Sequence, residues 1–432
     1  MADANADIRP YTIAVKDADI EDLKQRLSLA RFPDELEGAG WEMGAPLAEV
    51  RRLAQHWATG HDWRAAERDL NSRLPQFVTD IQCDTDGGFE PLAVHFVHVR
   101  SGQPHAVPLL FIHGWPGQFL EVAKIIRPLA EGGGAGGGSE GGDDNSSSAP
   151  AFDVVAPSLP NFGFSEGPKK RGFALEQYAE TLNKLMLKLG YDEYVTQGGD
   201  WGAHLSRALA HLYPQHCKAT HLNYEGADPP SWLRQPLLAL QHALTPYTAY
   251  DQRGLARSRW FQEEGRGYLA EQSTRPQTLG YGLADSPVAL LAWIYEKLHD
   301  WTDGPYPWTD DEVCTWVSIY WFSTAGPAAS VRIYYEMAHN VDGRAGKLGR
   351  HGLRAWTPGV KLGFSRFPRD LSIVPSAWLR TLGDVVFERA HDSGGHFAAW
   401  ERPDDLVADV RAMYGRGGGA FGVVKGRSGY PS

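Results

Sequence analysis

The sequence has few cysteines, and the three that it has lie far apart, at Cys83, Cys217 and Cys314. An odd number of scattered cysteines predicts neither a disulfide framework nor a zinc site. A small secreted fold held together by disulfides is therefore excluded. A reducing compartment is the simpler expectation, and we predict a cytoplasmic location.

Long apolar runs and an excess of positive charge are also missing. No stretch reaches the ~18 consecutive apolar residues of a transmembrane helix, and the opening Met1-Ala2-Asp3-Ala4-Asn5 is too polar for a signal peptide. The 42 Lys and Arg against 53 Asp and Glu give a net charge of −11, which argues against nucleic acid as a partner. The short basic run at 169–171 is interpreted as a solvated loop. We expect a soluble globular protein with no membrane anchor, and 432 residues can bury a large core.

The most informative segment is Gly198-Gly199-Asp200-Trp201-Gly202. It has the small-x-nucleophile-x-small pattern of a nucleophile elbow, in which a strand turns sharply into a helix. We predict the strand over 194–197 and the helix over 203–212. Because the nucleophile position holds Asp200, a carboxylate that can attack saturated carbon replaces the usual serine. Taken alone, the pentapeptide could equally be a glycine-rich turn with a capping aspartate.

A second motif supports the elbow. The apolar run 108–112 predicts a buried strand, His113-Gly114-Trp115-Pro116-Gly117 follows it, and 119–129 has helical spacing. In a hydrolase with an elbow, the loop at this point supplies one main-chain N–H of the oxyanion hole, and the residue after the nucleophile supplies the other. The predicted donors are therefore the amides of Trp115 and Trp201. By itself this loop would be an ordinary Pro/Gly turn.

The third motif, Ser393-Gly394-Gly395-His396-Phe397, follows a predicted last strand at 385–388 and precedes a predicted helix at 403–414. A lone histidine is more often structural. His396, however, lies in a Gly-rich loop after a strand, in the chain order nucleophile, acid, histidine. Of the 16 histidines, it alone has this setting.

The acid that orients His396 should follow a strand between Asp200 and His396. Asp370 comes directly after a predicted strand at 360–367 and is the preferred candidate, since function gathers outside the carboxyl ends of parallel strands. Asp384 precedes its strand, Asp392 has the setting of a turn residue, and Glu388 is expected within a strand.

With these motifs the chain resembles the α/β-hydrolase-fold epoxide hydrolases of the microsomal type. The resemblance covers most of the chain and includes the N-terminal segments Ile8-Arg9-Pro10-Tyr11, 20–27 and Arg31-Phe32-Pro33-Asp34. It implies an α/β fold with a mostly parallel sheet, helices on both faces, a helical lid insertion and an N-terminal helical extension. Helical periodicity over 20–74 agrees with the extension.

The resemblance also implies two lid tyrosines that activate the epoxide oxygen. Gly267-Tyr268 matches the context of the first, and Ser330-Val331-Arg332-Ile333-Tyr334-Tyr335-Glu336 matches that of the second, where the register points to Tyr334. The implied reaction is attack of Asp200 on an epoxide carbon, followed by hydrolysis of the ester by water that His396 and Asp370 activate. The implied partners are a small-molecule epoxide and water, with a possible homodimer, and no metal or organic cofactor is expected.

The expected organisation has four parts: an N-terminal extension at 1–104, a first core segment at 105–225, a lid at 226–345 and a second core segment at 346–432. The extension is expected to end in a strand at 92–99 that begins the sheet. The low-complexity stretch 131–150, followed by a predicted strand at 152–156, is interpreted as a surface loop insertion. We see no internal repeats.

Three alternatives compete with the epoxide hydrolase. A haloalkane dehalogenase uses the same aspartate, histidine and acid but needs halide-binding donors such as indole N–H groups. Trp201 could serve either enzyme, so Tyr268, Tyr334 and the extension favour the epoxide. A non-catalytic relative that kept the fold is disfavoured by the presence of all the catalytic residues, and Asp200 disfavours a serine esterase.

Overall fold

A large sheet runs through the protein, whose structure is a computed structural model that describes residues 7–85, 88–132, 149–304, 306–339 and 348–431. Within these residues the sheet has nine strands in the order β1-β2-β3-β5-β4-β6-β7-β8-β9. Neighbouring strands from β5 through β9 pair in parallel, whereas β1, β2, β3 and β5 pair antiparallel. The strands are β1 Arg9–Pro10, β2 Gln76–Ile81, β3 Leu92–Val99, β4 Val107–Ile112, β5 Phe152–Pro157, β6 Tyr194–Gly198, β7 Cys217–Leu222, β8 Thr357–Arg366 and β9 Gly383–Ala390.

The strands β4 and β5 were predicted from their apolar runs, and both predictions are confirmed. β4 and β5 are buried at every residue, as expected for parallel strands that are covered on both faces. The sheet begins earlier than predicted, because β1 and β2 add to it before β3. β2 was missed because its polar and apolar residues do not form a continuous run. Asp384 lies at the start of β9 and not before it.

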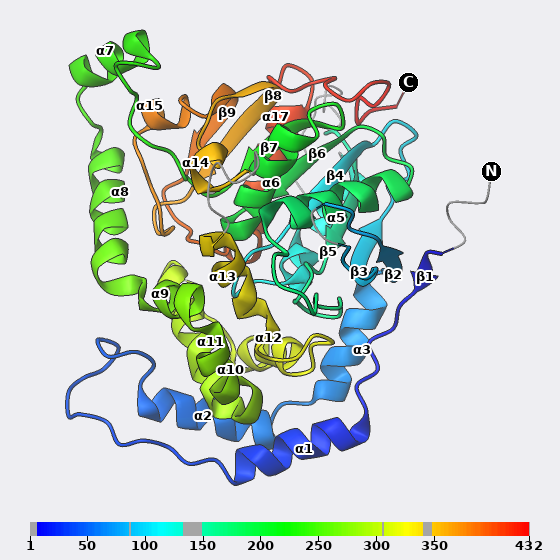
Figure 1. Cartoon of the computed structure of the whole chain (residues 1–432), viewed down its shortest axis with the longest axis vertical. Coiled ribbons are helices and arrows are strands. Elements are labelled where there is room, and N and C mark those ends of the chain that lie inside the picture. The colour runs from blue at the N-terminus through cyan, green and yellow to red at the C-terminus, as the bar shows by residue number, and fades with distance from the viewer. Residues whose placement is uncertain (1–6, 86–87, 133–148, 305, 340–347, 432) are drawn as a thin grey trace, which may run out of the picture.

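Helices cover both faces of the sheet (Figure 1). The helices α5 (Leu175–Lys188) and α6 (Asp200–Leu212) pack against each other in front of the sheet in this view, and α17 (Pro403–Tyr414) lies behind it. α17 also contacts α4 (Ile126–Glu131). The helix predicted over 119–129 is interrupted, since the 3₁₀ helix η1 (Phe119–Lys124) precedes α4. This α/β arrangement matches the predicted fold class.

The lid helices, which we define as α7 to α13, connect β7 to the last two strands. They are α7 Pro236–Leu244, α8 Ala249–Trp260, α9 Gly267–Thr274, α10 Pro276–Asp285, α11 Pro287–Trp301, α12 Asp310–Trp321 and α13 Arg332–His339, with the π-helical turn η2 Phe261–Gly265 and the 3₁₀ turn η3 Ala329–Val331. The N-terminal helices are α1 Asp17–Ser28, α2 Leu47–Thr59 and α3 Trp63–Arg73. They pack on α11 and α12, which lie between α1 and α2 and the sheet (Figure 1).

Three short helices complete the described chain: α14 Arg350–Leu353, α15 Ser376–Leu379 and α16 Ala398–Glu401. No helix in the described ranges is both long and apolar enough to cross a membrane. Most of the low-complexity stretch, residues 133–148, lies outside the described residues, as do 340–345 at the end of the predicted lid. The boundaries between the four predicted parts stay predictions.

Candidate active site

Asp200 lies at the turn from the central strand β6 into α6. Its φ of +48° is in the left-handed region, which is costly for a residue with a side chain and typical of a strained functional turn. Gly202 makes the turn possible, because a Cβ there would lie 1.8 Å from the carbonyl oxygen of Ile112 on the neighbouring strand. The sharp turn places the Asp200 carboxylate at the N-terminus of α6, where the helix dipole favours negative charge.

Two main-chain amides bind the Asp200 carboxylate. The N–H of Trp115 donates to Oδ1 at 2.8 Å, and the N–H of Trp201 also donates to the carboxylate. The loop that follows β4 lies so close to this carboxylate that a Cβ at Gly114 would be 2.4 Å from Asp200 Oδ1. Both amides predicted from the sequence therefore donate to the Asp200 carboxylate.

His396 connects Asp200 to Asp370. Its Nε2 is 3.5 Å from Asp200 Oδ2, and its Nδ1 is 2.6 Å from Asp370 Oδ1. The His396 main-chain N–H donates to the carbonyl oxygen of Trp301 at 2.8 Å, and this anchors the loop to the end of α11. Asp370 is only 2% exposed and follows β8, as predicted.

The other acids considered from the sequence lie elsewhere. Asp384 forms an ion pair with Lys361, and Glu388 forms one with Arg366. Geometry therefore brings Asp370, and neither of these acids, to His396.

The charges of this triad are mutually stabilising. Burial opposes the charged form of His396, but the carboxylates of Asp370 and Asp200 outweigh burial and raise its pKa to about 10. Burial likewise raises the pKa of Asp200, yet His396 and the amides of Trp115 and Trp201 lower it by more, so the net shift is downward. The resting site thus holds an imidazolium between two carboxylates.

The two predicted tyrosines lie side by side over the loop that carries Trp115. Tyr268 on α9 stacks on Trp115 with ring centroids 5.2 Å apart, and Tyr334 on α13 packs edge-on against Trp201 at 4.9 Å. Their own rings are 5.8 Å apart, and both side chains are buried. The Tyr334 hydroxyl interacts with the side chains of Trp201 and Tyr268, although among the described residues no contact reaches full hydrogen-bonding geometry. Burial raises the pKa of Tyr334 well above its usual value, so it remains a donor.

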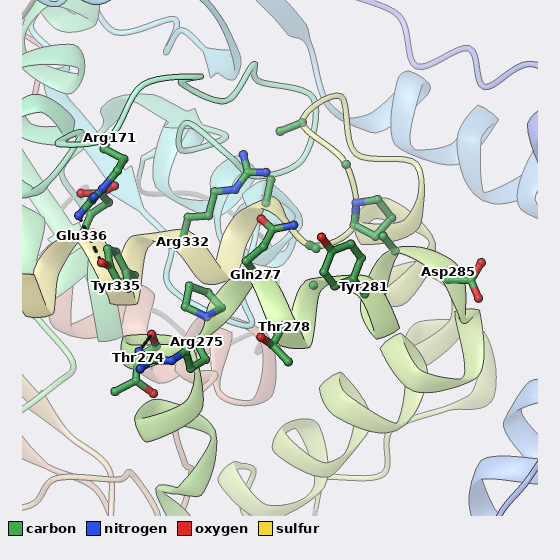
Figure 2. A pocket seen from close by; sticks show the side chains of 18 of the residues that line it. Arg171, Thr274, Arg275, Gln277, Thr278, Tyr281, Asp285, Arg332, Tyr335 and Glu336 are labelled. Carbon is green, nitrogen blue, oxygen red and sulfur yellow. Dashed lines mark hydrogen bonds between the residues drawn. The ribbon is translucent and has the colours of Figure 1, made fainter.

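Tyr335 lies in a separate pocket on the outer side of the lid (Figure 2). This pocket has a volume of about 910 Å³, and Tyr281, Arg332 and Glu336 also line it. Arg171 donates to the Tyr335 hydroxyl at 3.2 Å. α13 therefore separates the two adjacent tyrosines, one toward Asp200 and the other toward the outer pocket.

Sequence reasoning missed two residues of the site. Trp301 packs edge-on against His396 with centroids 5.1 Å apart, and Glu121 on η1 lines a small cavity together with Asp200 and His396. Glu121 had one signal, since it is a carboxylate in the otherwise apolar segment Phe119-Leu120-Glu121-Val122 directly after the oxyanion loop. Across the part of the chain that the structure describes, no group of His, Cys, Asp and Glu has the geometry of a metal site.

Comparisons with known proteins agree with this geometry. Residues 8–122 match the family profile described as epoxide hydrolase N terminus, and residues 107–264 match that of the alpha/beta hydrolase fold. A relative from Stigmatella aurantiaca is 38% identical over 94% of this chain and 84% of its own length. Epoxide hydrolase 1 from Oryctolagus cuniculus is 33% identical over 94% of this chain and 89% of its own. The structure of Aspergillus niger epoxide hydrolase superposes with a TM-score of 0.77 at 34% identity, covering 95% of this chain and 97% of that one.

Proposed function

Since the chain belongs to the epoxide hydrolases of the microsomal type, an enzyme family that acts on epoxides, we propose that it converts epoxides to vicinal diols through an ester on Asp200. The observation that carries this proposal is that the two oxygens of the Asp200 carboxylate have different partners. Oδ1 is held by the Trp115 amide, while Oδ2 faces His396. Oδ2 is therefore the oxygen available to attack.

In the first step, Asp200 Oδ2 forms a bond to one epoxide carbon while the bond from that carbon to the ring oxygen breaks. The leaving oxygen takes a proton from Tyr268 or Tyr334, whose buried hydroxyls support this role. Without such a proton the product would be a bare alkoxide beside buried aromatic rings. General-acid help of this kind is typically worth about 10²–10⁴-fold. The product is a hydroxyalkyl ester on Asp200 and a tyrosinate.

Esterification changes the protonation of His396. The ester carries no charge, so one of the two carboxylates that raise the pKa of His396 is lost and the pKa falls. The proton of the imidazolium returns to the tyrosinate. This leaves a neutral imidazole, oriented by Asp370, which can act as a base.

In the second step, His396 takes a proton from water, and the water oxygen adds to the carbonyl carbon of the ester. The negative charge develops on Oδ1, which already lies at the Trp115 amide; losing one such donor typically costs roughly 10²–10³-fold. Collapse breaks the ester C–O bond, and the leaving alkoxide takes a proton from His396 to give the diol. The proton left on the new carboxyl group moves to His396 and restores the resting imidazolium.

The dehalogenase alternative is not favoured. Its sequence argument rested on the indole of Trp201 as a halide donor, but Trp201 packs against Tyr334, and the compared relatives are named epoxide hydrolases.

The test uses the His396→Gln variant, which keeps the nucleophile and removes the base. After mixing with styrene oxide, we expect a stable mass increase equal to one intact epoxide, mapped to Asp200 by peptide digestion. A panel of epoxides that gives no adduct, together with alkylation by a haloalkane and release of halide, would refute the proposal.

A further inference from the structure

Glu121 is a buried carboxyl group next to the reacting atoms, and the steps above assign it no task. It lies on η1, directly after the loop that supplies the Trp115 amide. Its Oε1 accepts a hydrogen bond from the Gln118 N–H at 3.0 Å. The carboxyl group packs directly on the loop backbone, since a Cβ at Gly117 would lie 1.8 Å from Oε1.

The cavity that Glu121 lines has the size of one water molecule. Its volume is about 10 Å³, and its wall includes Glu121, Gln197, Asp200 and His396. A volume near this value can hold a single water, provided that the wall offers polar partners. Gln197 is 1% exposed, and its Oε1 has no hydrogen-bond partner among the described residues. The cavity is therefore polar as well as small.

Capping of η1 alone does not account for this position. A carboxylate is costly to bury, and the hydrogen bonds that it accepts from the main-chain N–H groups of Gln118 and Gly114 offset only part of that cost. Burial raises the pKa of Glu121 to about 7, while the positive charge of His396 lowers it. The side chain is thus retained in an unfavourable environment that faces the nucleophile and its base.

We propose that Glu121 holds the hydrolytic water against the Asp200 ester. This inference rests on the proposed function, because it concerns only the second step. One O–H of the water donates to the Glu121 carboxylate, and the other donates to Nε2 of the neutral His396. The water proton that is donated to Nε2 is then transferred to His396, and the water oxygen adds to the carbonyl carbon of the Asp200 ester. Glu121 keeps its hydrogen bond to the water throughout. Glu121 is therefore a positioning residue for hydrolysis.

The test compares the two steps in the Glu121→Gln variant by rapid mixing with styrene oxide, acid quenching and mass spectrometry of the intact protein. Hydrolysis of the ester should slow by about 10- to 100-fold, the value of one hydrogen bond to a charged group. Formation of the ester should stay within about twofold of the wild-type rate, so the ester should accumulate at steady state. A role in folding alone would slow both steps or neither.

Glu180→Gln on α5 is the matched control. Glu180 is also a buried carboxylate, and it accepts hydrogen bonds from the main-chain N–H groups of Asp84 and Thr85. It should change neither rate constant. If Glu121→Gln does not fold, Glu121→Asp retracts the carboxylate by one methylene and should also slow hydrolysis selectively.

The failures of the two proposals are distinguishable. An ester that Glu121→Gln hydrolyses at the wild-type rate overturns the inference alone. If no ester forms on Asp200 in the wild type, in His396→Gln or in Glu121→Gln, the proposed function fails and the inference fails with it.

Discussion

Tyr334→Phe removes one hydroxyl group from α13, and it should slow ester formation without changing how the side chain packs. In Tyr334→Phe the ring that packs against Trp201 and Trp115 remains, and only the oxygen is lost. If two tyrosines share the protonation of the epoxide oxygen, the loss of one should slow ester formation by about 10²-fold, the lower end of general-acid help. This corresponds to about 2.7 kcal/mol of transition-state stabilisation. The double variant Tyr268→Phe/Tyr334→Phe should lose about 10⁴-fold.

The same substitution should not destabilise the fold. The Tyr334 hydroxyl is buried beside the side chains of Trp201 and Tyr268, but neither contact has full hydrogen-bonding geometry, so its removal breaks no well-formed hydrogen bond. Such a change is close to neutral or slightly stabilising. The midpoint of urea unfolding should therefore equal that of the wild type or exceed it.

Tyr335→Phe is the control from the adjacent position. Its hydroxyl accepts a hydrogen bond from Arg171 in the outer pocket (Figure 2), which Asp200 does not line. Single-turnover ester formation should be unchanged in this variant. The assignment is wrong if Tyr335→Phe slows ester formation as much as Tyr334→Phe does, or if Tyr334→Phe reacts at the wild-type rate.

Three further predictions concern pH and stability. Ester formation should be nearly constant between about pH 6 and 9, because the pKa of Asp200 is lowered and that of Tyr334 is raised. Ester hydrolysis should instead rise with pH up to the pKa of His396 in the ester, which lies below its resting value of about 10, and then level off, because only the neutral imidazole acts as a base. Stopped-flow rates for each step check this, and a hydrolysis rate that falls as pH rises contradicts it. Gly202→Ala should lower the free energy of unfolding by about 3 kcal/mol or more, since its Cβ would meet the Ile112 carbonyl oxygen. Gly282→Ala on α10, where a Cβ meets nothing within 4 Å, should be neutral or stabilising. Urea unfolding compares the two variants, and equal stabilities would argue against the close approach. Arg366→Met should lower the free energy of unfolding by about 3–5 kcal/mol, because it removes the cation that pairs with the buried carboxylate of Glu225. Adding Glu225→Leu should recover part of this loss in the same assay. A single variant as stable as the wild type would refute the prediction.

Local sequence determined much of the sheet and the elbow. A continuous apolar run such as 107–112 has few alternatives to a buried parallel strand, and the glycines around Asp200 permit a turn that residues with side chains cannot make. These features depend on neighbours within a few positions, so a single sequence reveals them. The edge strand β2 was missed because its pairing with β3, and not its own pattern, makes it a strand.

Tertiary structure alone decided which side chains meet. Asp370 and His396 are 26 positions apart, and Asp200 is 170 positions before Asp370, so only the parallel alignment of β6, β8 and β9 brings the three together. The orientation of Tyr334 and Tyr335 follows from how α13 packs between the core and the outer pocket. The one-water cavity beside Glu121 exists only where η1, β6 and the His396 loop enclose it. Sequence specifies backbone turns and strands locally, whereas distances between reacting groups are set by the packing of segments remote in the chain.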